Sequence, residues 1–188
     1  MFQTGTLFVI KNVVFDMGEI YLFTGPGGGK TTNALGLALR SIGHDHKVII
    51  IQFLKWWTQT GEYKVQEKLA PLYEIHQFGR KGWIGLENLT DDDRKLVRDA
   101  MEFTEKAVKE KNPNLLVLDE LNLAAHCNLV PMDDIIAWLE RLKQNKNMTI
   151  AITGRHAPEK LLEIADYVNI IEVKKIPKQF GTTKGIQW

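Results

Sequence analysis

The most chemically suggestive part of the sequence is a glycine-rich run that ends in a lysine and two threonines: Gly25, Pro26, Gly27, Gly28, Gly29, Lys30, Thr31 and Thr32. Glycine lets main-chain N–H groups turn toward an anion, where a side chain would block the approach. The lysine would add a cation, and the first threonine hydroxyl would reach a magnesium ion. The pattern predicts a site for the phosphates of ATP or a related nucleotide. A plain glycine turn is the alternative.

The sequence on either side of this loop favours phosphate binding. An apolar run precedes it at residues 20–23, and apolar residues recur at spacings of three and four over residues 31–42. A strand, a glycine loop and a helix in this order are the context of a P-loop, and the helix directs its positive dipole end at the anion. The motif departs from the usual spacing at Thr24, where a glycine is expected.

Two adjacent carboxylates, Asp119 and Glu120, end another apolar run at residues 115–118. The carboxyl ends of parallel strands form the ligand crevice of an open α/β sheet, so both carboxylates should lie near the P-loop. Hard cations take oxygen ligands. We therefore expect Thr31, Asp119 and Glu120 to hold Mg²⁺ directly or through water.

Two cations, Lys55 and Arg155, follow other predicted strands at the same edge of the sheet. They could neutralise a leaving polyphosphate, whose charge is spread over many oxygens. Either could instead be a solvated loop charge. His126 and Cys127 are expected to be packing residues, and the sequence leaves the role of His156 open.

Apolar runs and helical patterns alternate along the chain, which is typical of βαβ units around a parallel sheet. Strands are predicted at residues 19–24, 47–53, 73–78, 115–119, 148–153 and 167–173. Helices are predicted at residues 31–42, 91–111, 133–143 and, briefly, 161–165. The predicted fold class is α/β, a mostly parallel sheet flanked by helices with the RecA-like architecture of P-loop NTPases. Residues 18–173 would form this domain, and residues 174–188 a tail that contributes to the site.

The composition argues against several classes of protein. A net charge of +1 gives no basis for a nucleic-acid or membrane-surface partner. The single cysteine excludes an internal disulfide and fits a reducing compartment, so a cytoplasmic protein is expected. No apolar run is long enough to span a bilayer. Residues 1–17 lack the features of a signal peptide and are expected to be an added edge strand or an extension upstream of a start at Met17.

Seven short motifs occur in an order that resembles the P-loop type of ATP:corrinoid adenosyltransferase, over residues 18–188. They are the glycine loop from Thr24 to Thr32, Gln52-Phe53-Leu54-Lys55, Gly61-Glu62, Leu118-Asp119-Glu120-Leu121-Asn122, Ile152-Thr153-Gly154-Arg155, Ala165-Asp166 and Gly185-Ile186. A shortened loop belongs to that family, which accounts for Thr24.

The resemblance implies that the Co(I) of a reduced corrinoid attacks the 5′ carbon of ATP and expels triphosphate. The loop amides, Lys30 and Mg²⁺, together with Lys55 or Arg155, would stabilise this polyanionic leaving group. No general base is needed, because the nucleophile is the cobalt itself. The resemblance also implies a homodimer and a flavoprotein reductant as a partner.

Family members also use aromatic side chains to hold the corrinoid without its lower axial ligand. Phe78 and Trp83 occupy the matching region, and Trp83 is the stronger candidate, although it could instead pack on the core. The spacing of the stretch 79–85 departs from the family pattern. Trp56 and Trp57 also stand where a glycine often follows the lysine.

Two other functional classes remain open from the residues alone. A RecA-like ATPase or a nucleoside kinase would act on the γ-phosphate, with Glu120 activating water in the hydrolytic case. A nucleotide-gated binding module would show no turnover. The absence of an arginine-rich lid segment weakens the kinase interpretation.

Overall fold

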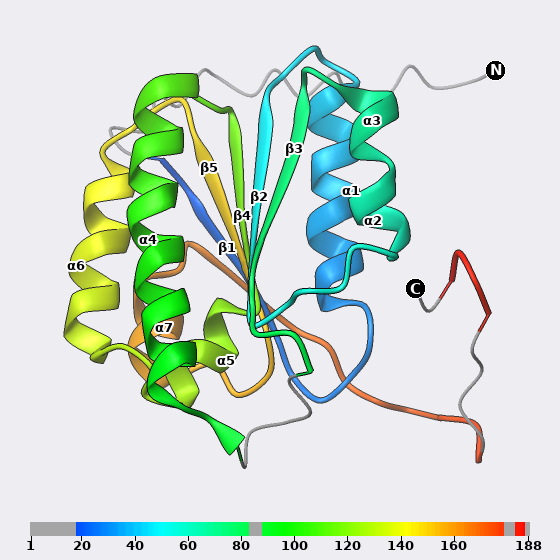
Figure 1. Cartoon of the computed structure of the whole chain (residues 1–188), viewed down its shortest axis with the longest axis vertical. Coiled ribbons are helices and arrows are strands. Elements are labelled where there is room, and N and C mark those ends of the chain that lie inside the picture. The colour runs from blue at the N-terminus through cyan, green and yellow to red at the C-terminus, as the bar shows by residue number, and fades with distance from the viewer. Residues whose placement is uncertain (1–17, 83–87, 179–182, 187–188) are drawn as a thin grey trace, which may run out of the picture.

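The computed structural model describes residues 18–82, 88–178 and 183–186. Within these ranges, six parallel strands form one sheet in the order β3-β2-β4-β5-β1-β6 (Figure 1). The strands are β1 Ile20–Thr24, β2 Val48–Phe53, β3 Tyr73–Phe78, β4 Leu115–Asp119, β5 Thr149–Thr153 and β6 Tyr167–Ile170. The predicted α/β class with a parallel sheet is confirmed.

Helices cover both faces of the sheet (Figure 1). Their bounds are α1 Lys30–Ile42, α2 Gly61–Lys64, α3 Gln66–Leu69, α4 Asp91–Lys111, α5 Leu121–His126, α6 Met132–Lys143 and α7 Glu159–Ile164. One face packs against α1, α2 and α3, and the other against α4, α5, α6 and α7. Because every strand points the same way, all carboxyl ends lie at one edge, where the loop from β1 to α1 also lies.

The buried apolar residues form two clusters, one on each face of the sheet, which explains why the central strands are continuous apolar runs in the sequence. In β4, Leu116 and Leu118 pack toward α4 and α6, whereas Leu115 and Val117 pack toward α1. A strand covered on both faces needs apolar side chains in both directions, so the alternation of a one-sided sheet is lost.

A capping box fixes the start of the long helix α4. The Thr90 side chain accepts a hydrogen bond from the Asp93 N–H, and the Asp93 carboxylate accepts one from the Thr90 N–H.

The last predicted strand is shorter than expected. Its prediction ran to Val173, but β6 ends at Ile170, and all four of its residues are exposed. Beyond Ile170, the main chain of Ile171 is hydrogen-bonded to the P-loop, a contact that strand periodicity could not indicate. The two interpretations of residues 1–17 lie outside the described residues. No helix in the described ranges combines the length and apolar character needed to cross a membrane.

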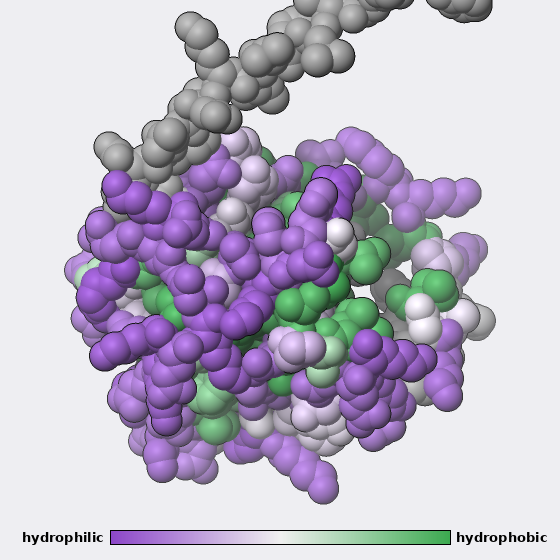
Figure 2. All heavy atoms as spheres, turned by 90° about the horizontal axis from the view of Figure 1, so that it is seen from above, coloured by the Kyte–Doolittle hydropathy of each residue, from purple (hydrophilic) through white to green (hydrophobic). Residues whose placement is uncertain are grey.

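A groove of about 480 Å³ opens between α1, α2 and α3. Figure 2 shows apolar side chains gathered around a hollow on the side of the molecule where these helices lie. The groove begins at the P-loop and the loop after β2, with Thr31, Thr32 and Lys55. Its apolar wall includes Leu35, Leu39, Ile42, Val65, Leu69 and, from the tail, Ile186. Cavities of this size accommodate small ligands.

Candidate active site

The P-loop wraps around the ammonium group of Lys30. Gly25 and Gly29 have φ angles of 103° and 105°, a conformation that side chains strongly disfavour. The Lys30 Nζ donates to the carbonyl oxygens of Gly25, at 2.9 Å, and Gly27. Burial and the nearby Arg155 lower the pKa of Lys30, and Glu120 partly offsets this effect. The loop and lysine therefore lie together at the N-terminus of α1, as predicted.

The outer side of the P-loop is held by the segment that follows β6. The Ile171 N–H donates to the Thr24 carbonyl and the Gly27 N–H donates to the Ile171 carbonyl, each at 2.8 Å. A Cβ added at Gly27 would lie 2.7 Å from the Ile171 oxygen, and one at Gly25 would lie 2.6 Å from it. These two glycines are thus required by the close approach of another chain segment. The sequence patterns did not identify Ile171 as a neighbour of the loop.

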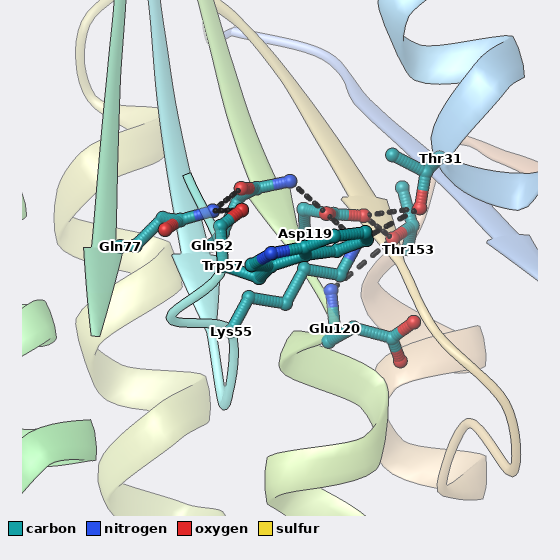
Figure 3. Close-up of polar contacts among 8 residues, drawn as sticks. All are labelled: Thr31, Gln52, Lys55, Trp57, Gln77, Asp119, Glu120 and Thr153. Carbon is teal, nitrogen blue, oxygen red and sulfur yellow. Dashed lines mark hydrogen bonds and ion pairs between the residues drawn. The ribbon is translucent and has the colours of Figure 1, made fainter. Parts of the chain in front are cut away.

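The carboxylate of Asp119 is the centre of the site (Figure 3). It is fully buried and accepts four hydrogen bonds. Its Oδ1 accepts from the hydroxyls of Thr31, at 2.7 Å, and Thr153, at 2.6 Å. Its Oδ2 accepts from Gln52, at 2.9 Å, and Lys55, at 2.6 Å. Burial opposes ionisation, but the Lys55 charge and these bonds hold the pKa of Asp119 below its ordinary value. The carboxylate is therefore ionised.

A left-handed turn after β2 brings Lys55 back over the sheet edge. Leu54 has a φ of 59°, and its N–H donates to the Phe78 carbonyl at 2.9 Å. Gly79 makes the turn possible, because a Cβ there would lie 2.5 Å from the Lys55 nitrogen. Burial tends to lower the pKa of Lys55, but the charge and hydrogen bond of Asp119, with smaller effects of Glu120 and Glu62, together outweigh burial and raise it. Lys55 is thus a fixed cation beside Thr31, whose hydroxyl lies 3.4 Å from its Nζ.

Glu120 differs sharply from its neighbour Asp119. It has a φ of 64°, lies immediately before α5, and directs its carboxylate away from the Asp119 contacts (Figure 3). In the described residues, no side chain or main-chain N–H is hydrogen-bonded to this carboxylate. Burial and then the Asp119 charge raise the pKa of Glu120, against the opposing effects of Lys55, Lys30 and Arg155. It is the carboxylate with oxygens still available to a ligand.

The side-chain oxygen atoms of this site can be compared with the ligands that Mg²⁺ prefers. No group of three or more His, Cys, Asp or Glu side chains among the described residues could hold a metal unaided. The four hydrogen bonds of Asp119 occupy its acceptor positions. The Thr31 hydroxyl and the Glu120 carboxylate are oxygen donors, which suits a magnesium ion that also keeps phosphate and water ligands. Asp119 would then act through the Thr31 hydroxyl.

The remaining predicted site residues lie in different surroundings. Arg155 follows Gly154 at the end of β5 and is exposed, but close enough to influence the pKa values of Lys30 and Glu120. Phe78 packs against Phe103 of α4, with 5.5 Å between ring centroids, so its contact with a corrinoid stays a prediction. Trp83 lies outside the described residues.

The residues for which packing was expected, or left open, lie on α5 and the loop after β5. His126 stacks on His156, with 4.8 Å between ring centroids. Cys127 packs against the core cluster on the α4 side of the sheet, and burial raises the pKa of its thiol. Packing is confirmed for Cys127, whereas His126 is exposed and its ring stacks on His156, a partner that sequence reasoning missed.

The sheet order, the glycine loop at the end of β1 and the buried acid at the end of β4 define a P-loop nucleotide-binding protein. A sequence model of one family, described as ATP:corrinoid adenosyltransferase BtuR/CobO/CobP, matches residues 16–188. The chain belongs to this family, which confirms the resemblance.

Curated relatives agree with the family match. A corrinoid adenosyltransferase from Sinorhizobium sp is 30% identical over 173 residues, covering 88% of this chain and 77% of the relative. One from Escherichia coli K12 is 29% identical over 154 residues, covering 82% and 76%. Corrinoid adenosyltransferase CobA from Salmonella typhimurium is 27% identical over the same length, with the same coverage.

Two glycine substitutions should separate the packing of the P-loop from its ligand contacts. Gly27→Ala places a methyl group against Ile171 and is expected to lower the free energy of unfolding by about 1–3 kcal/mol. Gly28→Ala meets no atom within 4 Å and should leave the melting temperature unchanged while weakening ATP binding. Thermal unfolding and nucleotide titration measure the two effects. Equal melting temperatures for the two variants would contradict the packing argument.

The raised pKa of Glu120 predicts that this side chain reduces stability at neutral pH. Because the native state binds its proton more tightly than the unfolded chain, the free energy of unfolding falls as pH rises from the ordinary pKa through the raised one. Glu120→Gln should therefore melt at a higher temperature than the wild type at pH 8, and the difference should close toward about pH 4. Turnover should nevertheless fall. Glu102→Gln, on the exposed side of α4, is the control and should show neither change.

Proposed function

We propose that this protein transfers the 5′-deoxyadenosyl group of ATP to the Co(I) of a corrinoid and releases triphosphate. The cobalt electron pair forms the bond to C5′, the C5′–O5′ bond breaks, and its electron pair leaves with the triphosphate oxygen. Membership of the adenosyltransferase family establishes the class of reaction. The observation in the site that carries the proposal is the saturated, ionised Asp119, which is a fixed electrostatic anchor and not a proton acceptor.

The cations of the site suit a leaving group that gains charge as it departs. We propose that the P-loop N–H groups and Lys30 bind the triphosphate, with Lys55 and Arg155 near its developing charge. Preorganised donors and cations of this kind stabilise the transition state without rearranging during the reaction. The same three cations also act on Glu120, because each of them tends to lower the pKa of its carboxyl group. Residues 25–32 would make the direct contacts of the loop.

Magnesium is a proposed component of the site. Thr31 and Glu120 would hold it, with Asp119 orienting the Thr31 hydroxyl through their 2.7 Å hydrogen bond. When bound, the ion neutralises phosphate charge and orients the chain of phosphates. Lys55 would remain on the Oδ2 atom of Asp119, so the residues of the cluster need not exchange partners when the metal arrives.

The corrinoid is proposed to lie beyond the carboxyl ends of β2 and β3, against Trp83 and Phe78. The described residues on either side of Trp83 are tied together. Arg80 donates to the Asn88 carbonyl at 2.9 Å and forms an ion pair with the buried Asp93 of α4. The groove beside α1, lined partly by Gly185 and Ile186, would admit the rest of the nucleotide or a corrinoid side chain.

A homodimer is proposed, with β6 as the contact. This strand is one of the two edges of the described sheet, the other being β3, and Tyr167, Val168 and Ile170 are 43%, 42% and 67% exposed. Acidic residues precede β6 and lysines follow it: Glu163 and Asp166, then Lys174, Lys175 and Lys178. Antiparallel pairing of two copies about a twofold axis would bring these opposite charges together.

Sedimentation tests the proposed dimer. The wild-type protein is expected to sediment with about twice the 21.5 kDa chain mass, and the Val168→Lys variant is expected to sediment as a monomer. A monomeric wild type would contradict the proposal.

A flavoprotein is proposed as the source of electrons for Co(I), as the resemblance to the family implies. The single cysteine is consistent with the cytoplasm as the proposed location.

Product analysis tests the proposed reaction. ATP and a chemically reduced corrinoid should give triphosphate and an adenosylated corrinoid; ADP would indicate a kinase or ATPase, and neither product a binding module. Lys30→Ala should slow triphosphate release about a hundred- to thousand-fold, because one fixed charge at the leaving group is lost. Lys106→Ala, on the exposed surface of α4, is the control. Wild-type rates in Lys30→Ala would overturn the P-loop assignment.

A further inference from the structure

Three polar residues lie in one row across the carboxyl edge of the sheet. Gln52 of β2 is in register with Asp119 of β4 on one side and with Gln77 of β3 on the other. Gln52 Nε2 donates to Asp119 at 2.9 Å, and Gln77 Nε2 donates to Gln52 Oε1 at 2.8 Å. Gln77 Nε2 also donates to the main-chain carbonyl of Trp57 at 3.2 Å. Figure 3 shows this continuous path from Asp119 to the loop after β2.

The direction of every bond in the row follows from the charge of Asp119. An ionised carboxylate can only accept, so Gln52 must present its NH₂ group to Asp119 and its Oε1 to Gln77. Gln77 must then present its own NH₂ group, which also suits the Trp57 carbonyl. A flipped Gln77 amide would place its oxygen against two other acceptors. The carboxylate thus fixes the orientation of an amide two strands away.

The row ends on the same turn that carries Lys55. The turn leaves β2 through the left-handed Leu54 and is fastened to β3 at the Phe78 carbonyl. Gln77 supplies a second attachment from β3, at Trp57, two residues beyond Lys55. The Trp57 indole, 42% exposed, is directed over the same edge of the sheet (Figure 3). Both attachments limit where the Lys55 ammonium can lie.

We propose that Gln77 is a positioning residue for adenosyl transfer, which acts by keeping the Lys55 ammonium at Asp119 and Thr31. The inference rests on the proposed function. Gln77 touches neither Lys55 nor Asp119; it holds Gln52 against the carboxylate and the Trp57 carbonyl against the sheet. Without its NH₂ group, Gln52 and the turn both lose a fixed partner, and the cation can move. Displacing a catalytic group by about 1 Å can slow a reaction roughly a hundredfold.

The test is Gln77→Met, which keeps the length of the side chain and removes the donor. We expect kcat to fall about tenfold to a hundredfold, while KM for ATP changes much less. Gln66→Met is the matched control, because Gln66 also donates to a main-chain carbonyl, that of Tyr63 at 3.0 Å, away from the site. It should retain the wild-type kcat. Gln77→Asn, which keeps the amide but shortens its reach, gives the same readout if the methionine variant folds poorly.

A double-mutant cycle distinguishes positioning from general stabilisation. If Gln77 acts through Lys55, Gln77→Met should cause no further loss of kcat in a Lys55→Ala background. An equal loss in both backgrounds, or a wild-type kcat in the single variant, would overturn the inference. Absence of triphosphate with the wild-type protein would instead defeat the proposed function, so the two failures are distinguishable.

Discussion

The buried, ionised carboxylate of Asp119 is the constraint on which the site depends. An unpaired charge inside a protein is costly, so its oxygens must be satisfied by donors held in place. Four segments supply them: the first turn of α1, the ends of β2 and β5, and the turn after β2. The same bonds that make burial tolerable bring Thr31 and Lys55 together at the P-loop. The same hydrogen bonds therefore stabilise this edge of the sheet and fix the positions of Thr31 and Lys55 beside the P-loop.

The adjacent carboxylates of Asp119 and Glu120 show how environment assigns different roles to similar groups. The pKa of Asp119 is held low by Lys55 and hydrogen bonds in spite of burial, whereas burial and the charge of Asp119 raise that of Glu120. One side chain has its hydrogen-bonding capacity filled by the protein; the other has capacity for a ligand. Neighbouring titratable groups with opposite shifts are characteristic of active sites. Phosphoryl and adenosyl transfer could share such a site, and the family assigns it to adenosyl transfer.

The P-loop is supported from both sides by contacts within the protein. Lys30 fills its inner side, and the segment after β6 lies against its outer side through Ile171. Donors whose positions are fixed in advance need not reorganise as charge develops on a leaving group. The exposed strand β6 leads directly into the segment that packs on the P-loop. A protein chain paired with β6 would therefore lie next to that segment. The fold thus connects a surface strand to the P-loop through two main-chain hydrogen bonds.

The sequence by itself determined the α/β class, the main strands and helices, and the P-loop, because these depend on local periodicity and on residues close along the chain. It also predicted that Asp119 and Lys55 would share the P-loop edge, because parallel strands end together. It did not reveal the partners of Asp119, the row through Gln77, or the packing of Ile171 on the loop. Those depend on the register between strands and on the path of the chain after β6. Register is decided by the packing of side chains far apart in sequence, so only the tertiary structure could place these contacts.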